Sequence, residues 1–202
     1  MEDSNLVKME ESRVTEDGNE SQKLKRISDR FDLKDLNYFG FTKLHWAARK
    51  GDVNTAKLLL ESQTNDVNCR DSEGRTPLYF ACIMENLDMV NFLIESGTNV
   101  DVNASDNDGN TPLHEAVFHW STDIVRALLK SKTIEVDRTN CKKDTALHFA
   151  AANGIKKIAE YLIENGANVY ALNEDGETPL QVAASRKEKA MCDFLGKKML
   201  KD

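Results

Sequence analysis

Apolar residues recur along this chain with the spacing of short amphipathic helices. Residues 89–94, 124–129 and 158–163 each place large apolar side chains three and four positions apart, which is typical of a helix with one buried face. A shorter segment that begins at a threonine and contains leucine and alanine precedes each run by about ten residues. Each such unit therefore predicts two antiparallel helices.

Five of the shorter segments share one pattern, with threonine, leucine and alanine at fixed places. The threonines are 34, 35, 34 and 33 residues apart, and a constant period in this range is the signature of stacked repeats. Threonine can cap the start of a helix, and the proline that follows it in three copies suits the first helical position. The segments are residues 41–47, 75–81, 110–116, 144–150 and 177–183.

This pattern resembles the ankyrin repeat over roughly residues 37 to 202. The resemblance implies an all-α fold, an ankyrin-repeat solenoid of helix-loop-helix units with β-hairpin-like fingers. It also implies a binding role without catalysis, since these solenoids offer an extended concave surface to a protein partner. We expect ankyrin repeats 1 to 5 at residues 37–70, 71–105, 106–139, 140–172 and 173–202, the last including a C-terminal cap.

Glycines stand at several positions where the repeat needs a tight turn, and other residues replace glycine at a few of these positions. Gly74, Gly109 and Gly176 lie two residues before a threonine, where a tight turn needs positive φ, and Lys143 takes the corresponding place in repeat 4. Glu85 and Trp120 stand where a glycine normally separates the two helices.

The resemblance implies partner contacts at the fingers and at the ends of the first helices. Several of these positions, polar in a typical repeat, are apolar in repeats 2 and 3, and clustered apolar anchors are typical of interfaces. We expect the hot spot there, flanked by basic residues. In the alternative reading, Phe118 and Trp120 pack onto each other and fill the space left by the missing glycine. The predicted partner-binding residues are Phe41, Arg49, Lys50, Arg75, Ile83, Met84, Asn110, Phe118, His119 and Trp120.

Composition disfavours some classes of partner, and the residue pattern indicates no catalytic site. The formal net charge of −7 disfavours nucleic acids and anionic membrane surfaces as partners. The four cysteines are scattered, which indicates free thiols, and Cys82 takes a buried alanine place. His45, His114 and His148 occupy the motif histidine, for which the resemblance implies a hydrogen bond to neighbouring backbone. We expect no enzyme activity, cofactor or metal site.

The N-terminal region differs from the repeats. Residues 1–22 are acidic and predict a disordered tail, whereas Leu24, Ile27 and Phe31 share one helical face and predict a capping helix over residues 23–36. Ser28 follows two basic residues and is a candidate phosphorylation site.

Two binding hypotheses remain open. In the first, the chain is an adaptor or inhibitor that holds a protein partner in the concave groove. In the alternative, the N-terminal tail is the regulated binding segment and the repeats are its scaffold. Without a secretory signal, we expect a monomer in the cytoplasm, and a basic patch at residues 23–26 leaves the nucleus open as a second compartment.

Overall fold

The computed structural model describes residues 40–62, 65–95, 97 and 99–200, so the predicted acidic tail, capping helix and Ser28 site lie outside the described residues. Within the described part of the chain the fold is all-α, as predicted, with helices and turns and no strand. The helices are α3 (Lys43–Lys50), α4 (Val53–Glu61), α5 (Pro77–Ile83), α6 (Leu87–Glu95), α7 (Pro112–Phe118), α8 (Thr122–Leu129), α9 (Ala146–Ala152), α10 (Lys156–Glu164), α11 (Pro179–Ser185) and α12 (Lys189–Met199).

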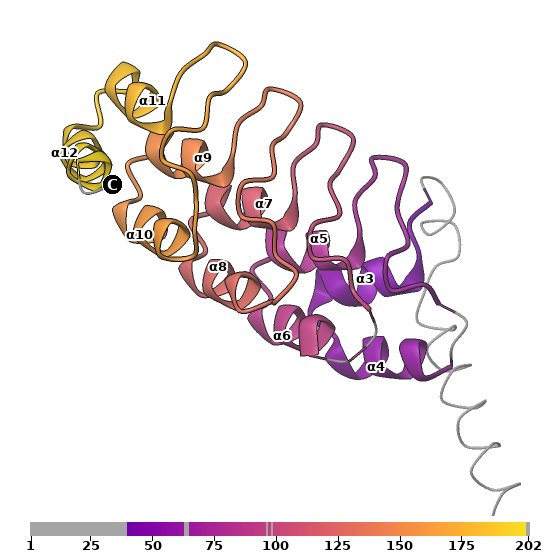
Figure 1. Ribbon diagram of the computed structural model, residues 1–202. Coiled ribbons are helices and arrows are strands. Elements are labelled where there is room, and N and C mark those ends of the chain that lie inside the picture. The colour runs from indigo at the N-terminus through magenta and orange to yellow at the C-terminus, as the bar shows by residue number, and fades with distance from the viewer. Residues whose placement is uncertain (1–39, 63–64, 96, 98, 201–202) are drawn as a thin grey trace, which may run out of the picture.

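These helices form pairs that are stacked side by side in two rows. The odd-numbered helices α3 to α11 make an inner row and the even-numbered helices α4 to α12 an outer row, with long turns extending beyond the inner row (Figure 1). Each inner helix contacts its own outer helix and the inner helix of the next pair. A helix of seven to nine residues is marginal alone, so the neighbouring pair supplies the packing that keeps it folded.

Small side chains let the inner helices approach one another. Ala47 and Ala48 of α3, and Ala150 and Ala151 of α9, are fully buried. Cys82 of α5 takes the corresponding place, and burial raises the pKa of its thiol, which keeps it protonated. This arrangement agrees with the sequence reading of Cys82 as a buried thiol.

A threonine caps each inner helix, and in three pairs a histidine extends the cap to the next pair. In α7 the backbone N–H of Thr111 donates to Nδ1 of His114 at 3.2 Å. Nδ1 is then an acceptor, so Nε2 carries the ring proton and donates to the carbonyl oxygen of Asp144 at 3.0 Å. His45 and His148 make the same link to the carbonyls of Arg75 and Glu177. These bonds fit the structural role expected for the motif histidines.

The turn between the two helices of a pair requires a left-handed residue. Gly51 and Gly154 supply it in the pairs α3–α4 and α9–α10, with φ of 68° and 64°. In the other pairs Glu85, Trp120 and Lys187 adopt φ of 55°, 59° and 64°, a conformation that L side chains disfavour. The predicted positive φ at the finger glycines and at Lys143 is also confirmed.

Replacing Lys187 by glycine should raise the free energy of unfolding by about 0.5–1 kcal/mol, because glycine adopts positive φ without a Cβ clash. As a control, Glu160→Gly in the interior of α10 should lower it by about 1 kcal/mol. Urea unfolding followed by circular dichroism measures both changes. A Lys187→Gly protein that is less stable than the parent would contradict the assigned strain.

Burial of His45 and His114 should make the fold sensitive to acid. Burial holds the pKa of His45 and His114 below the ordinary value of 6.5. Below pH 6.5 the unfolded chain therefore binds protons that the folded chain does not, and the free energy of unfolding falls as the pH drops through this value.

The variant His114→Gln tests this linkage. Gln181 already caps Thr178 in α11, with the Thr178 N–H donating to Oε1 at 2.8 Å, so glutamine preserves the cap. Loss of the bond to the Asp144 carbonyl should cost about 1 kcal/mol at pH 7.5. The difference in stability between pH 7.5 and pH 5.5, measured by urea unfolding, should shrink. An unchanged difference would show that His114 does not contribute to it.

Candidate protein-binding surface

The turns that project from the inner row are built around a short side chain that closes each loop. The Oδ1 atom of Asp71 accepts the backbone N–H groups of Glu73 and Arg75 at 3.0 and 2.8 Å. The same two bonds, to the residues two and four positions on, recur at Asp106, Asn140 and Asn173. The sequence analysis did not predict these two hydrogen bonds, although an aspartate or asparagine five residues before each capping threonine indicates them.

Neighbouring turns are joined to each other near their tips. The backbone N–H of Asn107 donates to the carbonyl of Glu73 at 2.9 Å, and that of Cys141 donates to the carbonyl of Asp108 at 2.9 Å. The approach is close, because a Cβ added at Gly109 would lie 2.8 Å from the nitrogen of Cys141. The turns therefore form a continuous edge along one side of the inner helices.

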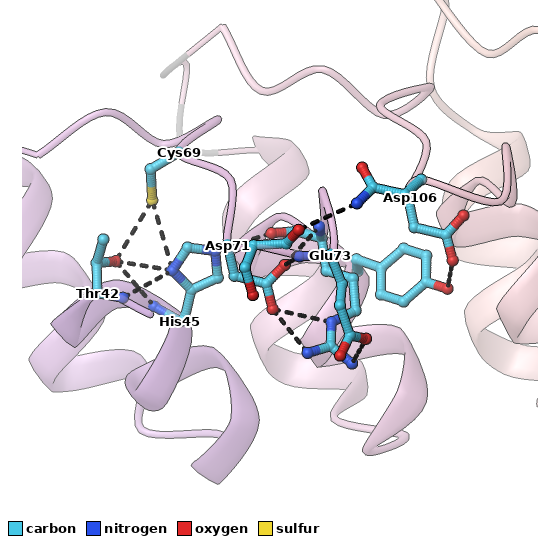
Figure 2. Close-up of polar contacts among 10 residues, drawn as sticks. Thr42, His45, Cys69, Asp71, Glu73 and Asp106 are labelled. Carbon is cyan, nitrogen blue, oxygen red and sulfur yellow. Dashed lines mark hydrogen bonds and ion pairs between the residues drawn. The ribbon is translucent and has the colours of Figure 1, made fainter. Parts of the chain in front are cut away.

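Charged side chains of the first complete turn pair with one another. The guanidinium of Arg75 lies 2.7 Å from a carboxylate oxygen of Asp71 and 2.7 Å from one of Glu73, the two acidic residues labelled in Figure 2. It also lies over the ring of Phe80, 4.8 Å from the centroid. The hydroxyl of Tyr79 donates to Asp106 of the next turn at 2.5 Å. Arg75, predicted to flank the hot spot, is thus held by residues of its own repeat.

Cys69 lies against the first cap. Its Sγ atom is 3.4 Å from Oγ1 of Thr42 and 3.8 Å from Nδ1 of His45, as Figure 2 shows. Burial raises the pKa of this thiol above its ordinary value, which is the opposite of what activates a cysteine nucleophile. The contact with His45 therefore gives no catalytic pair.

The floor of the inner row is mostly apolar, with one exception. The residue four positions after each capping threonine is Trp46, Phe80, Phe149 or Val182 in four pairs, and Glu115 in the α7–α8 pair. The Glu115 side chain is only 15% exposed, and its carboxylate lies 3.7 Å from Nε2 of His119. Burial raises the pKa of Glu115, and proximity to Tyr79 and His119 opposes the shift. A half-buried carboxylate thus lies at the centre of the inner face.

Large apolar side chains are exposed at the ends of the inner helices. Met84, Phe118 and Trp120 are 40%, 56% and 61% exposed. The ring contacts of Phe118 among the described residues are with His119 and Phe149, at centroid distances of 5.4 and 6.5 Å, rather than with Trp120. This observation favours the exposed reading of Trp120 over the alternative in which the two rings fill one space.

The other predicted contact residues divide by exposure. Arg49 and Lys50 are exposed at the end of α3, whereas Ile83, Asn110 and His119 are half-buried. Phe41 is half-buried because its ring stacks on His45 and meets Phe80 edge to face. The structure therefore leaves these positions accessible to different degrees along one row of repeats.

A groove of about 590 Å³ lies along α9 and α11, between these helices and their turns. It lies further toward the C-terminus than the predicted hot spot and shares Phe118 with it. Its position depends on the packing of Phe118 toward Phe149, which the repeat pattern does not reveal. It is lined by Phe118, Lys142, Asp144, His148, Phe149, Ala152, Asn153, Asn173, Asp175, Glu177, Val182, Ser185 and Arg186.

The described residues contain neither a candidate metal cluster nor a helix suited to a membrane. No group of three or more histidine, cysteine, aspartate or glutamate side chains there is placed to hold a metal ion. No helix within the same residues has the length and apolar character needed to cross a bilayer. The cysteines, all of which are described, are free thiols.

Several curated proteins are similar to this chain, and the names of some include the ankyrin repeat. Ankyrin repeat and IBR domain-containing protein 1 of Mus musculus is 26% identical over 161 residues, which cover 79% of this chain and 14% of the mouse protein. E3 ubiquitin-protein ligase Ufd4 of Drosophila melanogaster is 29% identical over 138 residues, 68% of this chain and 4% of the fly protein. Ankyrin repeat domain-containing protein 29 of Homo sapiens is 44% identical over 55 residues, 27% of this chain and 18% of the human protein.

The chain spans about a quarter or less of the length of the curated relatives that it matches. The family model for ankyrin repeats matches it three times, over residues 16–104, 44–140 and 132–201. Since these matches together extend over most of the sequence, and since the helix pairs stack as described above, the chain belongs to the ankyrin-repeat family.

Proposed function

We propose that this chain is a non-catalytic binding module, an adaptor or inhibitor that holds a protein partner against the inner face of its repeats. The observation that carries the proposal is Trp120, an indole that is 61% exposed on a residue with φ of 59°. Glycine occupies the equivalent place in two other pairs, at Gly51 and Gly154. Tryptophan therefore costs stability here without a packing gain that offsets it.

Strained residues persist where the strained side chain serves a function. An exposed indole is the kind of anchor that dominates protein interfaces, and Met84 at the end of α5 and Phe118 at the end of α7 are exposed as well. Arg49 and Lys50 are exposed at the end of α3 and can pair with carboxylates of a partner. Ile83, Asn110 and His119 complete the proposed contact set, and Phe41 and Arg75 support it from their packed positions.

We also propose that each of the five described helix pairs is one ankyrin repeat, with its turn acting as a finger. Support comes from the threonine period of 33 to 35 residues and from the common side-chain cap at the start of the inner helices. The fingers and inner helices then form one binding surface.

Replacing Phe118 by alanine and Trp120 by glycine should abolish most of the binding while the fold stays intact. Glycine at position 120 relieves the positive φ, so the double variant should be at least as stable as a Phe118→Ala protein. Affinity capture from cell lysate followed by mass spectrometry identifies the proteins that bind the parent and are lost with the variant.

Leu200→Ala is the matched control, because Leu200 is a large apolar side chain that is 88% exposed but lies at the C-terminal end of α12. It should retain every partner. Equal recovery of all bound proteins by the Phe118/Trp120 variant and by the Leu200 control would refute the proposed surface.

Deleting residues 1–22 separates this proposal from one in which the N-terminal tail binds. If the partner docks on the repeats, the truncated chain should retain at least about half of the parent affinity, since tail residues would add only exposed electrostatic contacts. Isothermal titration with a captured partner measures the difference. A loss of more than tenfold would favour the tail as the binding segment.

A further inference from the structure

The groove along α9 and α11 has an apolar floor that the repeats leave open. Phe118 is 56% exposed, Phe149 is half-buried, and their rings are 6.5 Å apart. Together with Val182 they line a space of about 590 Å³, which is within the range of sites that bury a few side chains of a ligand. An apolar side chain from a partner would replace water on these rings.

The rim of this groove is charged, and its charged side chains have no ion-pair partner among the described residues. Asp144, Asp175, Glu177, Lys142 and Arg186 line it, and none of the five makes an ion pair with another described residue. The carboxylate of Asp144 accepts a hydrogen bond from Nδ2 of Asn173 at 3.1 Å. The carboxylates of Asp175 and Glu177 have no hydrogen bond of this kind among the described residues.

The turn that precedes α5 differs in its charge pairing from the turn that precedes α11. In the turn before α5, Arg75 pairs with both Asp71 and Glu73, so each of these two carboxylates has a cationic partner. At the place of Arg75 the last turn has Glu177, so it carries a carboxylate where the earlier turn carries the cation. The carboxylates of Asp175 and Glu177 therefore lie at the groove without a cationic partner among the described residues.

Glu115 adds to the same field from beside the groove. Its carboxylate lies 3.7 Å from His119, whose ring meets Phe118 at a centroid distance of 5.4 Å. Phe118 in turn lines the groove. The residues that line the groove carry three carboxylates and two cations, and Glu115 lies beside them through His119 and Phe118, so the balance of charge is negative.

We propose that this groove binds a partner segment in which an aromatic or aliphatic side chain is followed within two or three residues by lysine or arginine. The apolar side chain packs between Phe118 and Phe149, and the basic side chain pairs with Asp175 and Glu177. This proposal rests on the proposed function and names the chemistry of the partner. Charge complementarity selects the basic segment, because an acidic one would meet unpaired carboxylates of like sign.

A peptide selection tests the proposal with a defined probe. A phage-displayed library of random twelve-residue peptides is selected on the full chain, and enriched peptides are synthesised with a fluorescent label. Lysine or arginine should be enriched within three positions of a phenylalanine, leucine or tryptophan. Fluorescence anisotropy should show that binding weakens as salt increases.

Variants of the groove then locate the contact. The double variant Asp175→Asn, Glu177→Gln should weaken peptide binding about tenfold and flatten its salt dependence. Phe118→Ala should weaken it by a similar factor. Glu160→Gln removes an exposed carboxylate from the outer helix α10 and should leave the affinity unchanged. Circular dichroism confirms that each variant is folded.

The outcomes separate this inference from the proposed function. Enrichment of acidic or uncharged peptides, or unchanged affinity in the Asp175/Glu177 variant, would overturn the basic-segment proposal, while sensitivity to Phe118→Ala would still support binding at this face. A library that yields no binding peptide would also overturn it. Peptides that bind both the Phe118→Ala protein and the rim variant as tightly as they bind the parent would count against both proposals.

Discussion

The fold depends on the burial of each helix pair by the next one. Inner helices of seven or eight residues carry too few contacts to be stable alone, and their leucines and alanines become fully buried only where the adjacent pair covers them. The histidine links reinforce this dependence, because Nε2 of His114 and His148 donates to a carbonyl of the following turn. One side chain thus caps its own helix and fixes the spacing of the repeats, and that spacing positions every residue of the inner face.

Much of this arrangement could be predicted from the sequence, because its causes are local. The helices follow from apolar residues three and four positions apart, and the left-handed turns follow from glycines at a constant distance from threonine. Other features could not be predicted in this way. Glu115 looks like any surface glutamate until the repeats are aligned and Phe80 and Phe149 appear at its place. Likewise, Arg75 becomes unavailable only because Asp71, four residues earlier, closes the same turn and faces its guanidinium.

Stability and recognition make opposite demands on the short turns between paired helices. Glycine would satisfy the backbone in every pair, yet Glu85, Trp120 and Lys187 occupy three of these turns at positive φ. A side chain at this position stands at the end of the inner helix, directed away from the core, where it can reach another molecule. The repeat architecture tolerates such strain because each turn follows an inner helix that packs against its neighbours, so the cost remains local.

The backbone bonding between neighbouring turns has a consequence for self-association. Between the described turns, the backbone N–H of Glu174 donates to the Lys142 carbonyl at 2.8 Å, and one such bond joins each pair of turns in place of a sheet ladder. The edge of the described turns therefore presents no long run of unpaired strand, which removes a template for uncontrolled self-association.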